Sequence, residues 1–154
     1  MTKHFLFLSF FVVFTFLGCS NNTPTVQGKE VIDTKKEYFT GGQISSEFLM
    51  IDKSGLNGRL KRYGYKGNLT SIIDVSNGVK NGMEVLYDEK RRTIRHVPYI
   101  NGRINGTFTD FYPNGDTLAT IPYINGVREG EAYSFRKDGS VARTVVFSKG
   151  KIVN

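Results

Sequence analysis

Two near-copies of one segment decide the fold of this chain: VPYINGRING at residues 97–106 and IPYINGVREG at residues 121–130. The copies begin 24 residues apart, and glycines recur at the same interval on three tracks through much of the chain. A fixed period of this length is the signature of a repeat protein. We therefore interpret the chain from about residue 38 as one unit used about four and a half times, with an irregular first copy. The glycines that define the repeat are Gly58, Gly78, Gly82, Gly102, Gly106, Gly115, Gly126, Gly130 and Gly139.

Each unit has the pattern of a β-hairpin. GTFTDFY (residues 106–112) and TLATIPYI (residues 117–124) have alternating patterns, and PNGD lies between them. Asn-Gly and Asp-Gly favour tight hairpin turns because glycine accepts a positive φ at little cost. The sequence predicts an all-β fold, a repetitive antiparallel β-meander of about ten strands in 24-residue hairpin repeats that form a single-layer sheet. In the NG-x-x-x-G segments between hairpins, both glycines are interpreted as marking the chain reversal. Disorder is rejected because the apolar residues keep a fixed phase.

The N-terminus has the features of an export signal. MTKHFLFLSFFVVFTFLGCS starts with a basic stretch, continues with 14 mostly apolar residues and ends in Gly18, Cys19 and a serine. A spanning helix needs ~20 apolar residues, so a secretory signal over residues 1–18 fits this segment better. FLGC resembles the lipobox of bacterial lipoproteins, with departures at Phe16 and Leu17. The alternatives are an ordinary cleaved signal and a buried thiol.

The lipobox resemblance implies that Cys19 is the lipidation site and that acyl chains make the membrane a partner. Ser20 resembles the residue that sorts lipoproteins to the outer rather than the inner membrane. Two or more acyl chains anchor a protein stably, whereas one does not. Residues 19–29 are largely polar and are predicted to form a lipid-anchored flexible tether. Residues 30–154 then form the repeat domain, placed at the bacterial cell envelope.

The composition excludes several classes of function. The net charge of +7 favours acidic partners, although a basic domain without such a partner is the alternative. His4 and His96 are the only histidines and Cys19 is the only cysteine, so a His/Cys metal cluster is excluded by count. No catalytic set or phosphate-binding loop is present, and we expect no enzymatic activity, no metal and no cofactor. Nucleic acid is not expected as a partner because the signal exports the chain.

One cluster of basic residues stands out in EKRRTIRH, residues 89–96. It replaces an expected turn glycine, and the repeat places the basic residues of 61–66 next to it. We interpret this cluster as a candidate patch for an anionic partner, either lipid headgroups or an acidic protein face. A solvated turn is the alternative. The candidate residues are Lys61, Arg62, Lys66, Lys90, Arg91, Arg92, Arg95, His96 and Arg103.

The repeat pattern resembles the MORN-repeat family in its bacterial variant form. The resemblance covers about residues 38–152, and it departs from the family at Arg91 and in the first copy. It implies a single-layer meander, and many such bacterial proteins carry an antitoxin-like label. We expect a membrane-anchored, non-enzymatic binding or scaffold module that binds a protein, glycan or lipid surface. The alternatives are an immunity or antitoxin-like lipoprotein that neutralises a toxin in the periplasm and, less favoured, an enzyme acting on envelope material.

Overall fold

A computed structural model describes residues 23–153 of the 154-residue chain. Within these residues the regular structure is β-strand throughout, without a helix. Ten strands are long: β3 (Asp33–Tyr38), β4 (Ile44–Met50), β5 (Gly58–Tyr63), β6 (Leu69–Ser76), β8 (Gly82–Tyr87), β9 (Thr93–Ile100), β11 (Gly106–Phe111), β12 (Thr117–Ile124), β14 (Gly130–Phe135) and β15 (Val141–Ser148). Six are short: β1 (Thr25–Val26), β2 (Lys29–Glu30), β7 (Val79–Lys80), β10 (Arg103–Ile104), β13 (Val127–Arg128) and β16 (Lys151–Ile152).

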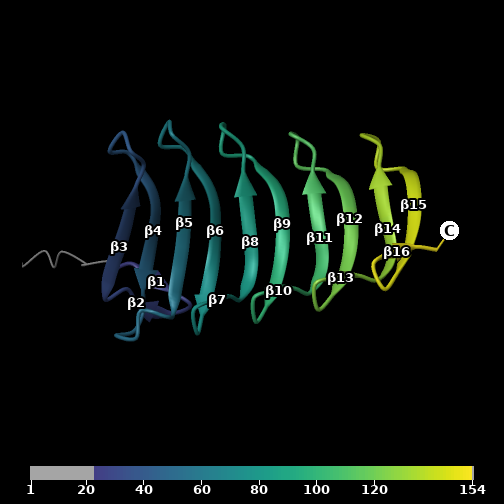
Figure 1. Cartoon of the computed structure of the whole chain (residues 1–154). Coiled ribbons are helices and arrows are strands. Elements are labelled where there is room, and N and C mark those ends of the chain that lie inside the picture. Colours follow the sequence, from purple (N-terminus) through teal and green to yellow (C-terminus); the bar gives the residue numbers. More distant parts are fainter. Residues whose placement is uncertain (1–22, 154) are drawn as a thin grey trace, which may run out of the picture.

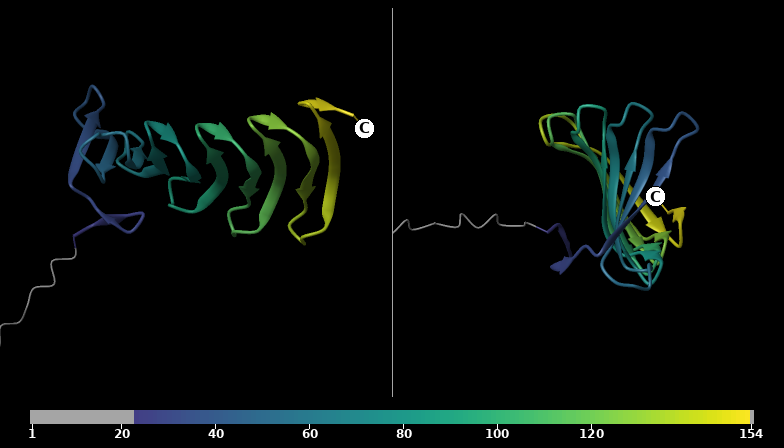
Figure 2. Two further views of the ribbon diagram at one scale, coloured as in Figure 1. Left: turned by 90° about the horizontal axis from the view of Figure 1, so that it is seen from below. Right: turned by 90° about the vertical axis from the view of Figure 1, so that its left-hand side faces the viewer.

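The predicted meander is confirmed. The ten long strands pair with their neighbours in chain order, all antiparallel, in one 14-stranded sheet that also includes β7, β10, β13 and β16. Figure 1 shows the successive hairpins side by side along one axis. Figure 2 shows that the sheet is curved and twisted along this axis. One repeat therefore adds two long strands and one short strand to the sheet.

The turns along one edge of the sheet follow a common design. The N–H of Tyr112 donates to the carbonyl of Asp116 at 2.8 Å, and the N–H of Gly115 donates to the carbonyl of Tyr112 at 2.9 Å. Gly115 has φ +96°, and the strand register shifts by one residue next to the turn. This is the three-residue hairpin loop in which a left-handed residue forms a bulge. We call the edge formed by these turns, residues 39–43, 64–68, 88–92, 112–116 and 136–140, the turn edge.

The opposite edge corrects the interpretation of the NG-x-x-x-G segments. Asn101 and Gly102 have φ +49° and +79°, as a two-residue type I′ turn requires, and they alone reverse the chain. Gly106 follows β10 and has φ +116°, so it bends one continuing strand from β10 into β11. Both segments pair with β9. The second glycine is needed because an L-residue is strained at this φ, and a Cβ there would lie 3.2 Å from Pro98 Cγ.

Side chains at this edge, opposite the turn edge, link each repeat to the next. The Asn105 side chain accepts a hydrogen bond from the Asn125 N–H at 3.3 Å, and the Asn81 side chain accepts one from the Asn101 N–H at 3.2 Å. In the last repeat Glu129 takes the same role toward the N–H of Lys149. The residue before the second glycine therefore caps the turn of the following repeat. These bonds satisfy backbone donors that a single-layer sheet would otherwise leave to solvent.

The two faces of the sheet differ in burial. The pairing registers place Leu60, Ile73, Glu84, Val97 and Phe108 in one row across neighbouring strands. Ile73 is 0% exposed, Glu84 6% and Val97 5%, so we call this the buried face. We call the other side of the sheet the open face. It carries a second row of side chains, each one position along its strand from a residue of the first row. That row contains Lys61, Ile72, Val85, His96, Thr109, Thr120 and Tyr133.

The N-terminal segment is more ordered than the sequence analysis expected. β1 and β2 form a two-stranded hairpin where a flexible tether to residue 29 was predicted, and the side chain of Val26 is 2% exposed. Gln27 and Gly28 have positive φ, as the two-residue turn of this hairpin requires. The predicted signal over residues 1–18, the lipidation site Cys19 and the sorting residue Ser20 lie outside the described residues.

Candidate binding recesses along the turn edge

Three recesses lie on the open face next to the turn edge, in consecutive repeats. They have volumes of about 350, 360 and 480 Å³, and we call them the first, second and third recess in chain order. Each of the seven residues that line the second recess lies 24 positions before a residue that lines the third. The pairs are Arg92 and Asp116, Thr93 and Thr117, His96 and Thr120, Phe111 and Phe135, Pro113 and Lys137, Asn114 and Asp138, and Gly115 and Gly139.

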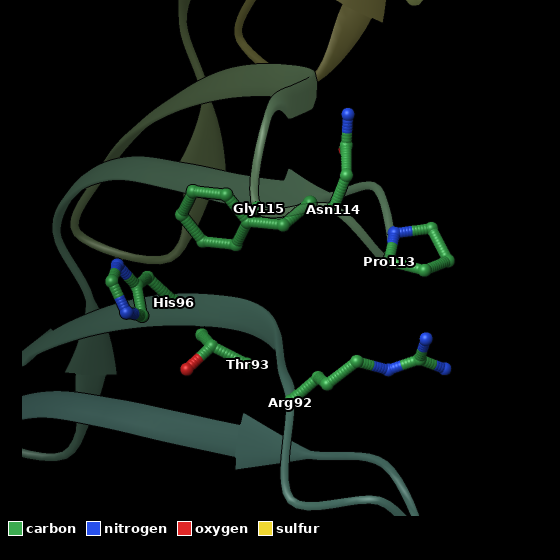
Figure 3. A pocket seen from close by; sticks show the side chains of 7 residues that line it. Arg92, Thr93, His96, Pro113, Asn114 and Gly115 are labelled. Atoms are coloured by element: carbon green, nitrogen blue, oxygen red, sulfur yellow. The ribbon is translucent and has the colours of Figure 1, made fainter.

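The second recess lies between the turn after β8 and the turn after β11. His96 from β9 and Phe111 from β11 point to the same face because Thr109, two residues before Phe111, pairs with His96. Their rings meet edge to face with centroids 4.8 Å apart. Figure 3 shows Arg92 on one side of the recess and Pro113 and Asn114 on the other. The floor is therefore aromatic and the rim is polar.

Arg92 is held in place by its own turn. Its Nη2 lies 2.6 Å from Asp88 Oδ2, and its backbone N–H donates to Asp88 Oδ1 at 2.9 Å. These bonds, led by the one from the backbone, hold the pKa of the Asp88 carboxyl below its usual value. The guanidinium is thus positioned at the rim of the second recess, and its other N–H groups can donate to a ligand.

The first recess is lined by Tyr63, Lys61, Arg91 and residues of the turn edge. The Tyr63 hydroxyl donates to Glu47 at 2.6 Å. Burial and this hydrogen bond raise the pKa of Tyr63 to about 12, and the same bond lowers the pKa of Glu47. Within residues 23–153, neither Lys61 nor Arg91 uses its side chain in a hydrogen bond or ion pair. Arg91 is available to a ligand, whereas Lys61 lies opposite Glu47 and also helps to lower the pKa of its carboxyl.

The third recess repeats the plan with different charges. Phe135 supplies the ring, and its backbone carbonyl accepts a hydrogen bond from the Tyr112 hydroxyl at 2.8 Å. Asp138 accepts bonds from the Ser140 hydroxyl and N–H, which lower the pKa of its carboxyl. Lys137 supplies a cation at the position of Pro113 in the preceding repeat.

The nine predicted basic residues do not form one patch. Arg62 and Arg95 lie on the buried face, where Arg62 Nη1 is 3.3 Å from Glu84 and Arg95 Nε is 2.6 Å from Asp110. Arg95 forms two hydrogen bonds with the Asp110 carboxylate, and this contact raises its pKa. Its guanidinium also lies 4.7 Å from the centroid of the Phe108 ring. These two arginines are therefore structural partners of carboxylates.

The other seven predicted basic residues lie in three places. Lys61, Arg91, Arg92 and His96 line the first two recesses. Lys66 is 3.2 Å from Glu89 in an exposed ion pair at the turn edge, where Lys90 also lies. Arg103 is on β10, at the opposite edge of the sheet. The part of the cluster that the fold brings together thus follows the turn edge of the open face.

A buried carboxylate with two cations beside it, on the other face, was not anticipated from the sequence. The Glu84 carboxylate lies 2.6 Å from Lys80 Nζ and 3.3 Å from Arg62 Nη1, with 8% of its side chain exposed. Two cations offset the cost of burying one carboxylate. A signal was present, because the same position of the repeat holds Leu60, Phe108 and an alanine in other copies. An acidic residue in an apolar track indicates a paired charge.

Among residues 23–153, no group of three His, Cys, Asp or Glu side chains is arranged to hold a metal ion. The same residues include no helix of the length and apolarity needed to cross a membrane. No protein-family model matches the chain, and no curated protein matches it.

Proposed function

We propose that this protein is a lipid-anchored, non-enzymatic binding module of the bacterial cell envelope that binds its partner along the turn edge of the open face. The observation that carries this proposal is the recurrence of a recess in three successive repeats: the second and third have the same seven lining positions, and the first shares five of them. A ring, hydrogen-bonding groups and a cation converge in each recess, as in sites that orient a ligand. Such a series suits recognition of an extended partner.

The electrostatics of the recesses support the same proposal. Within residues 23–153, neither Arg91 nor Lys137 makes a hydrogen bond or ion pair with a carboxylate. By contrast, Arg62 and Arg95 on the buried face are paired. An unpaired cation at the rim of a recess attracts an acidic partner and raises its rate of association.

The envelope location rests on the N-terminal sequence. Gly18-Cys19 follows the apolar segment, and acylation of Cys19 would tie the body to a membrane. The proposed membership of the MORN-variant family rests on the same repeat that builds the hairpins. The glycines at the five turns of the turn edge, replaced once by Arg91, support this assignment.

Site-directed photo-cross-linking in cells tests the proposal. A photoreactive residue at position 93, inside the second recess, is compared with one at position 144, which lies on the same face in β15 but lines none of the three recesses. We expect an envelope component to be captured from position 93 and not from position 144. Absence of capture from position 93, or equal capture from both, would contradict binding at the turn edge. Turnover of the captured component by the purified protein would contradict a non-enzymatic role.

A further inference from the structure

We infer that the three recesses bind successive units of an acidic envelope polysaccharide whose repeating unit is a disaccharide. This inference rests on the proposed function and names the chemistry of its partner. The first observation is the spacing of the recesses. Each repeat adds two long strands, and neighbouring strands lie ~4.8 Å apart, so the recesses recur about every 10 Å along the sheet. Two β-linked sugars in an extended polymer have a similar length.

The lining of the recesses fits sugar rings. Phe111 and Phe135 supply the rings of the second and third recesses from one position of the repeat, and Tyr63, which lies 48 residues before Phe111, supplies the ring of the first. An aromatic ring packs well against the apolar face of a pyranose. Thr93 and Thr117 place hydroxyl groups beside the second and third rings, which can bond the sugar hydroxyls. The recesses are open to solvent along the edge, so a polymer can cross all three without a chain end having to enter.

The charges of the first recess favour a polymer that carries carboxylates. Each recess holds at least one cation: Lys61 and Arg91 in the first, Arg92 in the second, Lys137 in the third. These residues come from different positions of the repeat, yet each recess receives one. The third recess carries a net negative charge because Asp116 and Asp138 outnumber Lys137, and Arg92 of the second is ion-paired with Asp88, whereas in the first Lys61 and Arg91 outnumber Glu89. We therefore expect a carboxylate of the polymer to be bound most tightly at the first recess.

A proline-rich or acidic peptide is the main competing occupant, because aromatic grooves also bind extended peptides. Extended peptides commonly gain affinity from backbone hydrogen bonds with an unpaired edge strand of a sheet. In the recesses the strands that supply the lining residues are already paired on both sides. The side chains alone are left for recognition, which favours a partner rich in hydroxyl groups.

Binding of hyaluronan oligosaccharides to the purified full-length protein tests this inference. Hyaluronan is the probe because it carries one carboxylate in each disaccharide. Fragments of two, four, six and eight sugars are titrated by calorimetry. Affinity is expected to rise with each disaccharide up to six sugars, one for each recess, and to level off at eight. Added salt should weaken binding, since the cations are at the surface. Chitin oligosaccharides of equal length, which lack the carboxylate, should bind more weakly.

Two variants locate the binding. Thr93→Trp fills the second recess and should reduce the affinity for six sugars to that for two, whereas Thr144→Trp on the same face should leave it unchanged. Arg92→Asp gives the second recess the residue that the third has at that position, so it tests the site even if Thr93→Trp does not fold. We expect it to weaken six-sugar binding at least several-fold.

Three outcomes would overturn the inference: affinity independent of length, binding no weaker for the neutral sugars, or tighter binding of polyglutamate or a proline-rich peptide of matched length. Cross-linking from position 93 separates its failure from that of the proposed function. Capture in cells without binding of the sugars refutes the polysaccharide alone. Loss of both refutes the binding module as well.

Discussion

Replacement of Arg91 by glycine should stabilise the protein, although it removes a charged side chain from a turn. Arg91 has φ +61°, in the left-handed region, while the equivalent residues Gly67, Gly115 and Gly139 have φ +75°, +96° and +81°. An L-residue in this region costs about 1–2 kcal/mol. Glycine loses more backbone entropy on folding, about 0.5–1 kcal/mol. The difference predicts a gain of about 0.5–1 kcal/mol in the free energy of unfolding.

The structure identifies no compensating loss. The Arg91 side chain makes no hydrogen bond or ion pair within residues 23–153, and its backbone N–H, which donates to the Asp88 carbonyl at 3.0 Å, is retained by glycine. For a chain of this size the expected gain corresponds to an increase of roughly 1–4 °C in the melting temperature. Urea unfolding followed by circular dichroism, together with a thermal melt, measures both quantities.

Two control variants test whether backbone strain is the cause. Arg91→Ala removes the same side chain but keeps a Cβ, so it should give no comparable gain. Gly115→Arg makes the reverse change in the next turn, where a Cβ would meet nothing within 4 Å, so the conformational cost alone should lower stability by about 1 kcal/mol. If Arg91→Gly and Gly115→Arg changed stability in the same direction, or if Arg91→Ala stabilised as much as glycine, the reasoning would be refuted.

Three further predictions concern other parts of the chain. Gly58→Ala places a Cβ 2.1 Å from the Leu49 carbonyl oxygen, and overpacking of this kind should lower the free energy of unfolding by about 3 kcal/mol in a denaturant titration; an unchanged midpoint would contradict the close approach. Tyr63→Phe should reduce the alkaline sensitivity of stability: the folded-state pKa of Tyr63 is raised to about 12, so its contribution is present below pH ~10 and is lost as the pH rises toward 12. The stabilities of the two proteins should converge between these pH values, and a constant difference would count against the raised pKa of Tyr63. Finally, Cys19→Ala should release the protein from membranes in cell fractionation, and continued tight association would argue against lipidation.

The repeat, and with it the fold, could be predicted from the sequence because local chemistry sets it. Glycines at a 24-residue interval supply the positive φ of both kinds of turn, and alternation between them requires strands. Antiparallel order follows because consecutive hairpins joined by tight turns have no other arrangement available. Arg91 was recognisable as an exception to the glycine track, and its φ of +61° shows that the surrounding turn imposes its conformation on the residue.

The sequence did not determine which basic side chains would share a surface. Arg95 and His96 are neighbours in the chain, but successive residues of a strand point to opposite faces, so Arg95 pairs with Asp110 on the buried face and His96 lines a recess. Only the register between strands, with its one-residue shift at each turn, fixes these partners. The sequence by itself therefore determined the hairpin array, because turns and alternation act over a few residues. The tertiary structure decided the paired charges and the row of recesses, because both depend on side chains that only strand pairing across repeats brings together.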